Sequence, residues 1–423
     1  MKRYVHDFGI LSVVLSLYCS SQSTQLRGAM YSDLLSFNGC LKTSDATCTL
    51  AAGTYTVTTP LLATGANLII EGQGQYQTVL RRGDTSVLRL LELSSSASNA
   101  LIRSLQFDGN KGLWFGPDGI LSHAELKTFL TGALTQEYQD VKLNSAINVR
   151  VDYCQFLNSA RYALHFSGSS AAVTNSGFTG GLDAAIRSYS TGPFLTSLLI
   201  YGNSISSYRG AGIILDRVSD SWVMNNTLLW NHSGDVWGGD IDQQLQGGGQ
   251  VYSANGAHDN IISGNSIDGL ADFGYQVPNN DGASLTLNNY GVELDSGQPT
   301  YNTTLSGNTV SRHGVAGYWI GGSVSGVVLN GETVTSNKVN GVQIEGSAAY
   351  FGVKIKGGSI QSNGGWPWPN GSDRPRGYGI HLWDVGSNGV CIQSDVSLTG
   401  NTSGETYSNN AGTYPDPRPA SCT

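Results

Sequence analysis

The sequence has 423 residues, of which 56 are Gly and 3 are Met, with 13% charged residues and a net charge of −8. A hydrophobic content of 39% excludes a disordered chain, and the abundance of Gly with so few charges predicts many turns and little helix. The acidic balance argues against nucleic acid or an anionic membrane as the partner and favours a glycan or a small molecule.

The N-terminus has the order of a secretory signal peptide. Lys2 and Arg3 precede an apolar run from Phe8 to Tyr18, and small polar residues follow the run. We therefore expect residues 1–23 to be a signal peptide and the protein to be secreted, with the periplasm or the cell surface as other destinations. The run is shorter than the roughly 20 residues that cross a bilayer, so no membrane insertion is expected.

Five of the 6 cysteines follow this segment. In an oxidising compartment we expect two disulfides, Cys40 with Cys48 and Cys391 with Cys422, one near each end of the chain. Cys154 is left over. It is expected as a small buried hydrophobe rather than a nucleophile, because neither a CxxC pattern nor a Cys/His arrangement surrounds it.

A short repeat then decides the fold. Tetrads of one pattern recur at steps of roughly 23 to 26 residues, the length of one solenoid turn; examples are Gly202-Asn203-Ser204-Ile205, Gly264-Asn265-Ser266-Ile267 and Gly307-Asn308-Thr309-Val310. The Asn of each tetrad is expected to stack on the Asn of the next turn and to have a structural role.

A second short strand follows each tetrad, and its alternation assigns the faces. The first and third residues point inward, and the middle residue points outward. The expected strands are Leu113-Trp114-Phe115, Leu164-His165-Phe166, Ile186-Arg187-Ser188, Ile213-Ile214-Leu215, Val251-Tyr252-Ser253, Val292-Glu293-Leu294, Tyr318-Trp319-Ile320, Val342-Gln343-Ile344 and Ile380-His381-Leu382.

From about residue 50 to 400 the chain resembles the pectin-lyase-like superfamily of right-handed parallel β-helices. The resemblance implies an all-β, single-stranded parallel β-helix solenoid, with an N-terminal cap and first turns at 28–86, the helix proper at 87–400 and a tail at 401–423. A short helical insertion is expected at 123–138, where leucines and Phe129 have amphipathic spacing. The superfamily includes lyases, hydrolases, epimerases and non-catalytic stalks, so the resemblance does not fix the function.

The outward residues predict a binding groove. Aromatic and histidine side chains are frequent among them, and exposed large aromatics commonly mark a binding surface. We expect an extended and possibly uronic-acid-containing polysaccharide, bound by a protein that acts as a monomer. The expected substrate-binding residues are Trp114, Trp319, Gln343, Glu345, His381, Trp383, Arg209 and Arg312, the two arginines belonging to a basic rim that could equally be solvated turn charge.

Two reaction types remain open for this groove, and a non-catalytic adhesin or glycan-binding module is the alternative to both. Asp216, Glu293 and Asp295 have a spacing near that of the acid and base of an inverting glycoside hydrolase. A polysaccharide lyase instead needs a base and cationic groups, parts that Tyr252, Arg187 and His165 would supply.

No cofactor is expected, with one reservation. The loop at 235–242 gathers Asp235, Asp240 and Asp242, which could hold Ca²⁺, although an ordinary acidic loop explains them as well.

Overall fold

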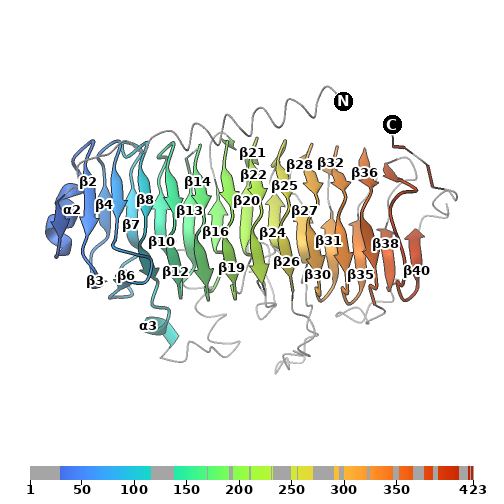
Figure 1. The fold of residues 1–423 in the computed structure, drawn as a ribbon, viewed down its shortest axis with the longest axis horizontal. Coiled ribbons are helices and arrows are strands. Elements are labelled where there is room, and N and C mark those ends of the chain that lie inside the picture. Colours follow the sequence, from blue (N-terminus) through green and yellow to red (C-terminus); the bar gives the residue numbers. More distant parts are fainter. Residues whose placement is uncertain are drawn as a thin grey trace.

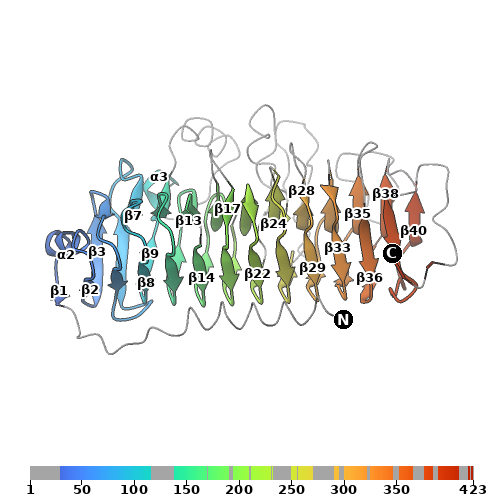
Figure 2. The same ribbon diagram turned by 90° about the horizontal axis from the view of Figure 1, so that it is seen from above.

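The computed structural model shows an elongated stack of parallel strands (Figures 1 and 2). It describes residues 29–115, 138–168, 170–189, 194–208, 211–229, 231, 249–254, 256–269, 290–294, 300–321, 324–345, 352–364, 376–383, 389–408, 418–419 and 421–422. The chain coils through three long sheets, here called A, B and C, visiting each once per turn. This is the β-helix solenoid that the repeat predicts.

Sheet A has 13 strands. Its members are β1 (Met30–Tyr31), β2 (Thr47–Leu50), β5 (Ile69–Glu71), β8 (Leu101–Arg103), β11 (Arg150–Asp152), β14 (Ala172–Thr174), β18 (Leu199–Tyr201), β22 (Trp222–Met224), β25 (Ile261–Ser263), β29 (Thr304–Ser306), β33 (Val328–Asn330), β36 (Val353–Lys356) and β39 (Val390–Ile392).

Sheet B has 11 strands. Its members are β3 (Gly53–Val57), β6 (Thr78–Arg82), β9 (Gln106–Asp108), β12 (Gln155–Leu157), β15 (Gly177–Thr179), β19 (Ser204–Ser206), β23 (Thr227–Leu229), β26 (Ser266–Asp268), β30 (Thr309–Ser311), β34 (Thr333–Thr335) and β37 (Ser359–Gln361).

Sheet C has 12 strands. Its members are β4 (Leu61–Ala63), β7 (Arg89–Leu93), β10 (Gln139–Leu143), β13 (Tyr162–Phe166), β16 (Ile186–Ser188), β20 (Ile213–Asp216), β24 (Gly249–Ala254), β27 (Tyr290–Leu294), β31 (Ala316–Ile320), β35 (Asn340–Glu345), β38 (Tyr378–Trp383) and β40 (Gly404–Ser408). Two small pairs add to the stack, β17 (Leu195–Thr196) with β21 (Val218–Ser219) and β28 (Thr300–Tyr301) with β32 (Val324–Ser325).

The interior is filled by aligned columns of apolar side chains. Most strands of sheets A and B are three residues long and bury only the middle one, so one column forms for each sheet. In sheet B, the ring of Phe156 stacks on Phe107 at 5.0 Å and on Phe178 at 4.6 Å between centroids. Burial of each such ring contributes roughly 1.5–3 kcal/mol, and in-register pairing lets every turn repeat that contribution.

The corner between sheets A and B explains the tetrads. Its first residue has a positive φ, as at Tyr153 (φ 52°) and Gly264 (φ 63°), which turns the chain sharply. The next residue points inward and joins a buried ladder. Within it, Asn265 Nδ2 donates to Asn308 Oδ1 at 2.9 Å, and Asn226 Nδ2 donates to Asn265 Oδ1 at 3.0 Å. The asparagines are therefore structural, as expected.

The N-terminal end of the stack is closed by α2 (Leu34–Cys40), which Asp33 caps by accepting a hydrogen bond from the Ser36 amide at 2.8 Å. A Cys40–Cys48 disulfide joins this helix to β2, and Cys391–Cys422 ties the C-terminal segment to β39, the two pairs that the sequence indicates. Cys154 is a buried free thiol, and burial raises its pKa to about 12.

Two expectations need correction. Leu113-Trp114-Phe115 is not a strand of sheet C, because the chain forms a helical turn there, α3 (Gly112–Phe115), and β10 supplies the strand of that turn. The stack also extends past residue 400, since β40 pairs with β38 inside the expected tail. The expected signal peptide and the expected helical insertion up to residue 137 lie outside the described residues. Neither α2 nor α3 is long and apolar enough to cross a membrane.

Candidate functional site on the outer face of sheet C

A single row of outward-facing strand positions follows the length of sheet C. Strand register links its members one to the next, in the order Lys142, His165, Arg187, Ile214, Tyr252, Glu293, Trp319, Gln343 and His381. This is the row that the sequence predicts, except that Lys142 stands where Trp114 was expected. Trp114 instead lies in α3 and packs edge-on against Tyr138, with centroids 5.0 Å apart. A three-residue apolar alternation cannot distinguish a strand from a helical turn, which accounts for the error.

Several polar members of the row are buried although they face outward. His165 is 2% exposed, Glu293 1%, and Gln343 and His381 are fully buried. Arg187 and Trp319 are half-buried. Buried polar side chains require hydrogen-bond partners, so this face is a constructed polar surface rather than a solvated flank.

The N-terminal part of the face is cationic and centred on Arg187. Its guanidinium lies between two phenol rings, 4.9 Å from the Tyr162 centroid and 5.0 Å from the Tyr189 centroid, and donates a hydrogen bond to the Tyr162 hydroxyl. Burial raises the pKa of Tyr162 above its usual range, and the Asp183 carboxylate adds to this effect, so the phenol remains protonated. Asp183 also forms a buried ion pair with Arg161 at 3.1 Å.

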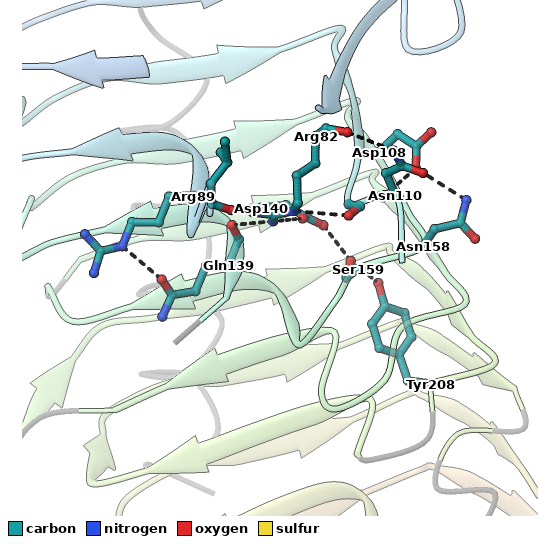
Figure 3. A network of polar contacts seen from close by, with 11 residues as sticks. Arg82, Arg89, Asp108, Asn110, Gln139, Asp140, Asn158, Ser159 and Tyr208 are labelled. Carbon is teal, nitrogen blue, oxygen red and sulfur yellow. Dashed lines mark hydrogen bonds and ion pairs between the residues drawn. The ribbon is translucent and has the colours of Figure 1, made fainter. Parts of the chain in front are cut away.

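His165 is the register neighbour of Arg187 and is held by an amide. Gln139 Nε2 lies 3.1 Å from His165 Nδ1. Gln139 Oε1 accepts a hydrogen bond from Arg89 Nε at 3.1 Å (Figure 3). The Tyr162 ring is 5.9 Å from the imidazole. An imidazole with a fixed orientation, an arginine and a protonated phenol therefore meet on β13 and β16.

A fully buried ion pair lies beside the backbone of Gln139 (Figure 3). Arg82 Nη2 contacts Asp140 Oδ1 at 2.9 Å and donates to the Gln139 carbonyl at 3.0 Å. Ser159 donates to Asp140 Oδ2 at 2.6 Å and lies 3.2 Å from the Tyr208 hydroxyl. Burial raises the pKa of Asp140 to about 7 and lowers the pKa of Arg82, each effect being opposed by the partner's charge. The pair anchors the backbone of β10 directly behind Gln139.

The C-terminal part of the face is aromatic and has fewer cations. Trp319 stacks on Tyr290, with centroids 5.1 Å apart. The His381 ring lies 5.7 Å from Trp383 and 5.6 Å from Tyr407. Gln343 donates to Glu345 across the end of β35. Flat rings of this kind can stack on the apolar faces of sugars.

The predicted hydrolase acids are only partly placed. Glu293 and the 6%-exposed Asp216 lie two strands and two residues apart, about 12 Å between backbones. Inverting hydrolases hold their carboxyl groups roughly 6.5–9.5 Å apart, a separation that two side chains can still reach from that backbone spacing. Asp295 lies outside the described residues, so this pairing remains a prediction.

Other predicted site residues lie away from the row on sheet C or outside the described part of the chain. Arg312 forms an ion pair with Asp268 at the end of sheet B. The backbone of Tyr252 occupies its expected place, but its side chain is not among those described. Arg209, Asp235, Asp240 and Asp242 lie outside the described residues. Within the described ranges, no group of three or more His, Cys, Asp or Glu side chains could hold a metal ion.

Sequence reasoning missed several residues of the cationic cluster, namely Gln139, Lys142, Tyr162 and Asp183. A signal for Lys142 was present, because Val141 and Leu143 alternate with Lys142 as a groove strand requires. The strand of this turn is expected at 113–115 instead. Tyr162 is the first residue of β13 and Asp183 precedes β16. At these positions the inward–outward alternation of a strand does not predict the direction of the side chain.

Comparison with known proteins agrees with the coiled architecture. The family described as "Right handed beta helix region" matches residues 140–403. The chain belongs to this family. No curated protein matches the sequence of this β-helix.

Solved structures similar to this right-handed β-helix include carbohydrate-active enzymes. One is the A-module of the Azotobacter vinelandii mannuronan C-5 epimerase AlgE6, with a TM-score of 0.57 and 15% identity over 92% of this chain and 95% of that one. The A-module of the same organism's epimerase AlgE4 gives 0.51 and 14%, over 92% and 98%. The catalytic domain of a GH87 α-1,3-glucanase in complex with tetrasaccharides gives 0.53 and 13%, over 86% and 64%. At these identities the likeness shows the fold alone.

Proposed function

We propose that the chain is a secreted polysaccharide lyase that cleaves a uronic-acid-containing glycan bound along the outer face of sheet C. The observation that carries the proposal is the pairing of Arg187 with His165 on adjacent strands, packed against the protonated phenol of Tyr162. The distant likeness to epimerases and to a glucanase supports a carbohydrate substrate without choosing the reaction.

An elimination reaction needs a base and cationic groups, and the cluster around Arg187 supplies the cationic groups. A base removes the proton beside the uronate carboxylate, the bond to the leaving oxygen breaks, a carbon–carbon double bond forms and the leaving oxygen takes up a proton. Negative charge builds on the carboxylate as the first proton leaves, so cationic donors at that position lower the barrier. Arg187 can bind a carboxylate in two-point fashion, and Lys142 adds positive charge two strands away.

Elimination also needs a base. Tyr252 is the candidate that the sequence offers, and register places it two strands from Arg187, about 10 Å along the stack. A sugar ring bound across β20 would lie between Arg187 and the strand position of Tyr252. Tyr162 is unsuited to this part, because burial raises its pKa.

Secretion fits the covalent structure of the chain. The two disulfides, Cys40–Cys48 and Cys391–Cys422, favour an oxidising compartment. Polysaccharides with uronic acids would be met outside the cell, where the predicted signal peptide would direct the protein.

A second candidate is an inverting glycoside hydrolase centred on Glu293. One observation favours it: Glu293 is almost fully buried and is the register neighbour of Trp319, whose ring could hold a sugar beside the carboxylate. The cluster at Arg187 would then bind substrate without reacting.

A screen of polysaccharides, read by absorbance near 235 nm and by reducing ends, separates the possibilities. New chromophore with new reducing ends is the expected result, and Arg187→Ala should reduce it at least about 100-fold. Reducing ends without chromophore, lost in Glu293→Gln or Asp216→Asn and kept in Arg187→Ala, would establish the hydrolase instead. Binding with no product from any polysaccharide would identify a glycan-binding module and reject both enzymes.

A further inference from the structure

The orientation of the Gln139 amide is determined by its neighbours. Arg89 Nε faces one end of the amide at 3.1 Å, and an arginine nitrogen can only donate a hydrogen bond. The end that faces Arg89 is therefore the carbonyl oxygen. The other end, 3.1 Å from His165 Nδ1, must then be the NH₂ group, which also can only donate. His165 Nδ1 is left as the acceptor.

An imidazole that accepts at Nδ1 carries its proton on Nε2 when neutral. The charged groups around the ring favour this neutral form. Lys142 on β10 and Arg187 on β16 flank His165 in register, while the Tyr162 phenol lies beside the ring. An imidazolium would add a third positive charge between two cations, and its Nδ1–H would point at the amide donor.

We infer that Gln139 is a positioning residue that holds His165, 2% exposed, as the Nε2–H tautomer, so that the ring carries a donor rather than a base at Nε2 beside Arg187. The inference rests on the proposed function for the part that this face has in catalysis. It makes His165 a donor, as Arg187 is, and assigns removal of the proton to a different residue.

The same arrangement occurs a second time in the sheet. The Tyr378 amide donates to Asn340 Oδ1 at 3.1 Å, which turns the NH₂ group of Asn340 toward His381 Nδ1, 3.3 Å away. In both places the amide residue lies on the strand before a tyrosine that precedes the histidine by three residues: Gln139 pairs in register with Tyr162, and Asn340 accepts the hydrogen bond from Tyr378.

The surroundings of the two histidines differ, which separates the effect of the amide from the effect of charge. His381 lies against the rings of Trp383 and Tyr407, whereas register places cations on both sides of His165. If the amide alone selects the tautomer, both rings carry the proton on Nε2. His381 therefore serves as an internal reference for His165.

Nitrogen NMR of the full chain labelled with ¹⁵N-histidine tests the inference without any substrate. The chain has 7 histidines, so His165→Gln and His381→Gln variants can assign the two signals. In the unaltered protein at pH 7, we expect Nε2 protonated and Nδ1 unprotonated for both rings. A proton on Nδ1 of His165, or a fully protonated ring, would overturn the inference.

Gln139→Glu replaces the donor with an acceptor that can still bind Arg89. We expect His165 to gain a proton on Nδ1 in this variant and to keep it to a higher pH, while His381 stays unchanged. Gln361→Glu is the matched control, because it adds the same charge on β37 of sheet B, away from the face. Failure of Gln139→Glu to change the His165 signals would mean that the amide does not select the tautomer.

Kinetics on a cleaved uronate polymer then distinguishes positioning from mere structure. Gln139→Leu should lower kcat at least about tenfold with a smaller change in KM, and should alter the pH dependence of kcat, in protein that remains folded by circular dichroism. A normal pH profile in a variant whose tautomer has changed would show that His165 does not contact the reacting sugar. The NMR measurement of the tautomer is independent of the activity assay. The predicted tautomer can therefore be wrong while lyase activity is confirmed, and it can be right while lyase activity is absent.

Discussion

Glu332 takes the place of an asparagine in the buried ladder, where its Oε1 accepts a hydrogen bond from Asn308 Nδ2 at 3.3 Å. Its second oxygen accepts a hydrogen bond from the Tyr318 hydroxyl inside the core. Burial raises the pKa of Glu332 to about 7, although these hydrogen bonds oppose the shift. The ladder therefore contains one residue whose charge depends on pH.

This carboxyl predicts a pH-dependent stability. An unfolded glutamate has a pKa of about 4.3, so between about pH 4.3 and 7 the folded protein keeps a proton that the unfolded chain has lost. The stabilisation is complete below pH 4.3 and is lost as pH rises to 7, with a slope of at most about 1.4 kcal/mol per pH unit. Glu332→Gln should flatten this part of the curve and raise the unfolding free energy at pH 8. Urea unfolding from pH 4 to 8 measures both.

The exposed Glu405 provides the control for that series, because Glu405→Gln removes the same charge from the edge of sheet C. Its pH curve should match that of the unaltered protein. An identical slope in Glu332→Gln and Glu405→Gln would show that Glu332 is ionised in the folded state over this range.

The two tryptophans of the aromatic part should bind sugar. Trp319→Ala and Trp383→Ala should each weaken binding of a uronate oligosaccharide by about 1 kcal/mol or more, because each loses a ring that is half-buried on the outer face rather than in the core. Titration calorimetry with oligomannuronate and oligogalacturonate measures the change. Trp222→Ala, a half-buried tryptophan of sheet A, should leave affinity unaltered, and equal losses in all three variants would place the ligand elsewhere.

The Arg82–Asp140 pair should be intolerant of single changes. Asp140→Asn leaves a buried guanidinium without its counter-charge and should cost about 3–5 kcal/mol in unfolding free energy. Arg81→Met, which breaks the ion pair of the half-exposed Arg81 with Asp108, should cost no more than about 1 kcal/mol. Denaturant unfolding compares them, and a loss below 1 kcal/mol for Asp140→Asn would mean that water reaches the pair.

Much of the fold could be read from local pattern, because a β-helix repeats the same chemical requirements in every turn. The tetrads identify the corner between sheets A and B, where a residue of positive φ is followed by a ladder asparagine. The alternation in Leu164-His165-Phe166 then places His165 on the outer face, and the same rule places Arg187 beside it. Register between turns follows from the inward columns.

The partners of the site residues could not be predicted in this way. Gln139 reaches His165 across 26 residues of sequence, and Arg89 reaches Gln139 across 50. Such contacts depend on the number of loop residues that precede the strand in each turn. The repeating pattern within the strands does not predict that number. Trp114 shows the opposite failure, since its local pattern is that of a strand while the chain uses it in a helical turn against Tyr138.

The ladder itself should carry a large share of the stability in the middle of the stack, and Asn265 tests this. Its Nδ2 donates to the Val223 carbonyl at 2.9 Å and to Asn308, while its Oδ1 accepts from the Asn226 amide at 2.9 Å. Asn265→Ala would leave a buried carbonyl and a buried amide without these partners, each at a cost of about 1–3 kcal/mol. We therefore expect a loss of about 3 kcal/mol or more in unfolding free energy, measured with urea.

The half-buried Asn330, whose Nδ2 reaches Ser306 only at 3.5 Å, supplies the control, and Asn330→Ala should cost less than 1 kcal/mol. Equal losses of unfolding free energy in the two variants would show that the asparagine ladder does not stabilise the fold.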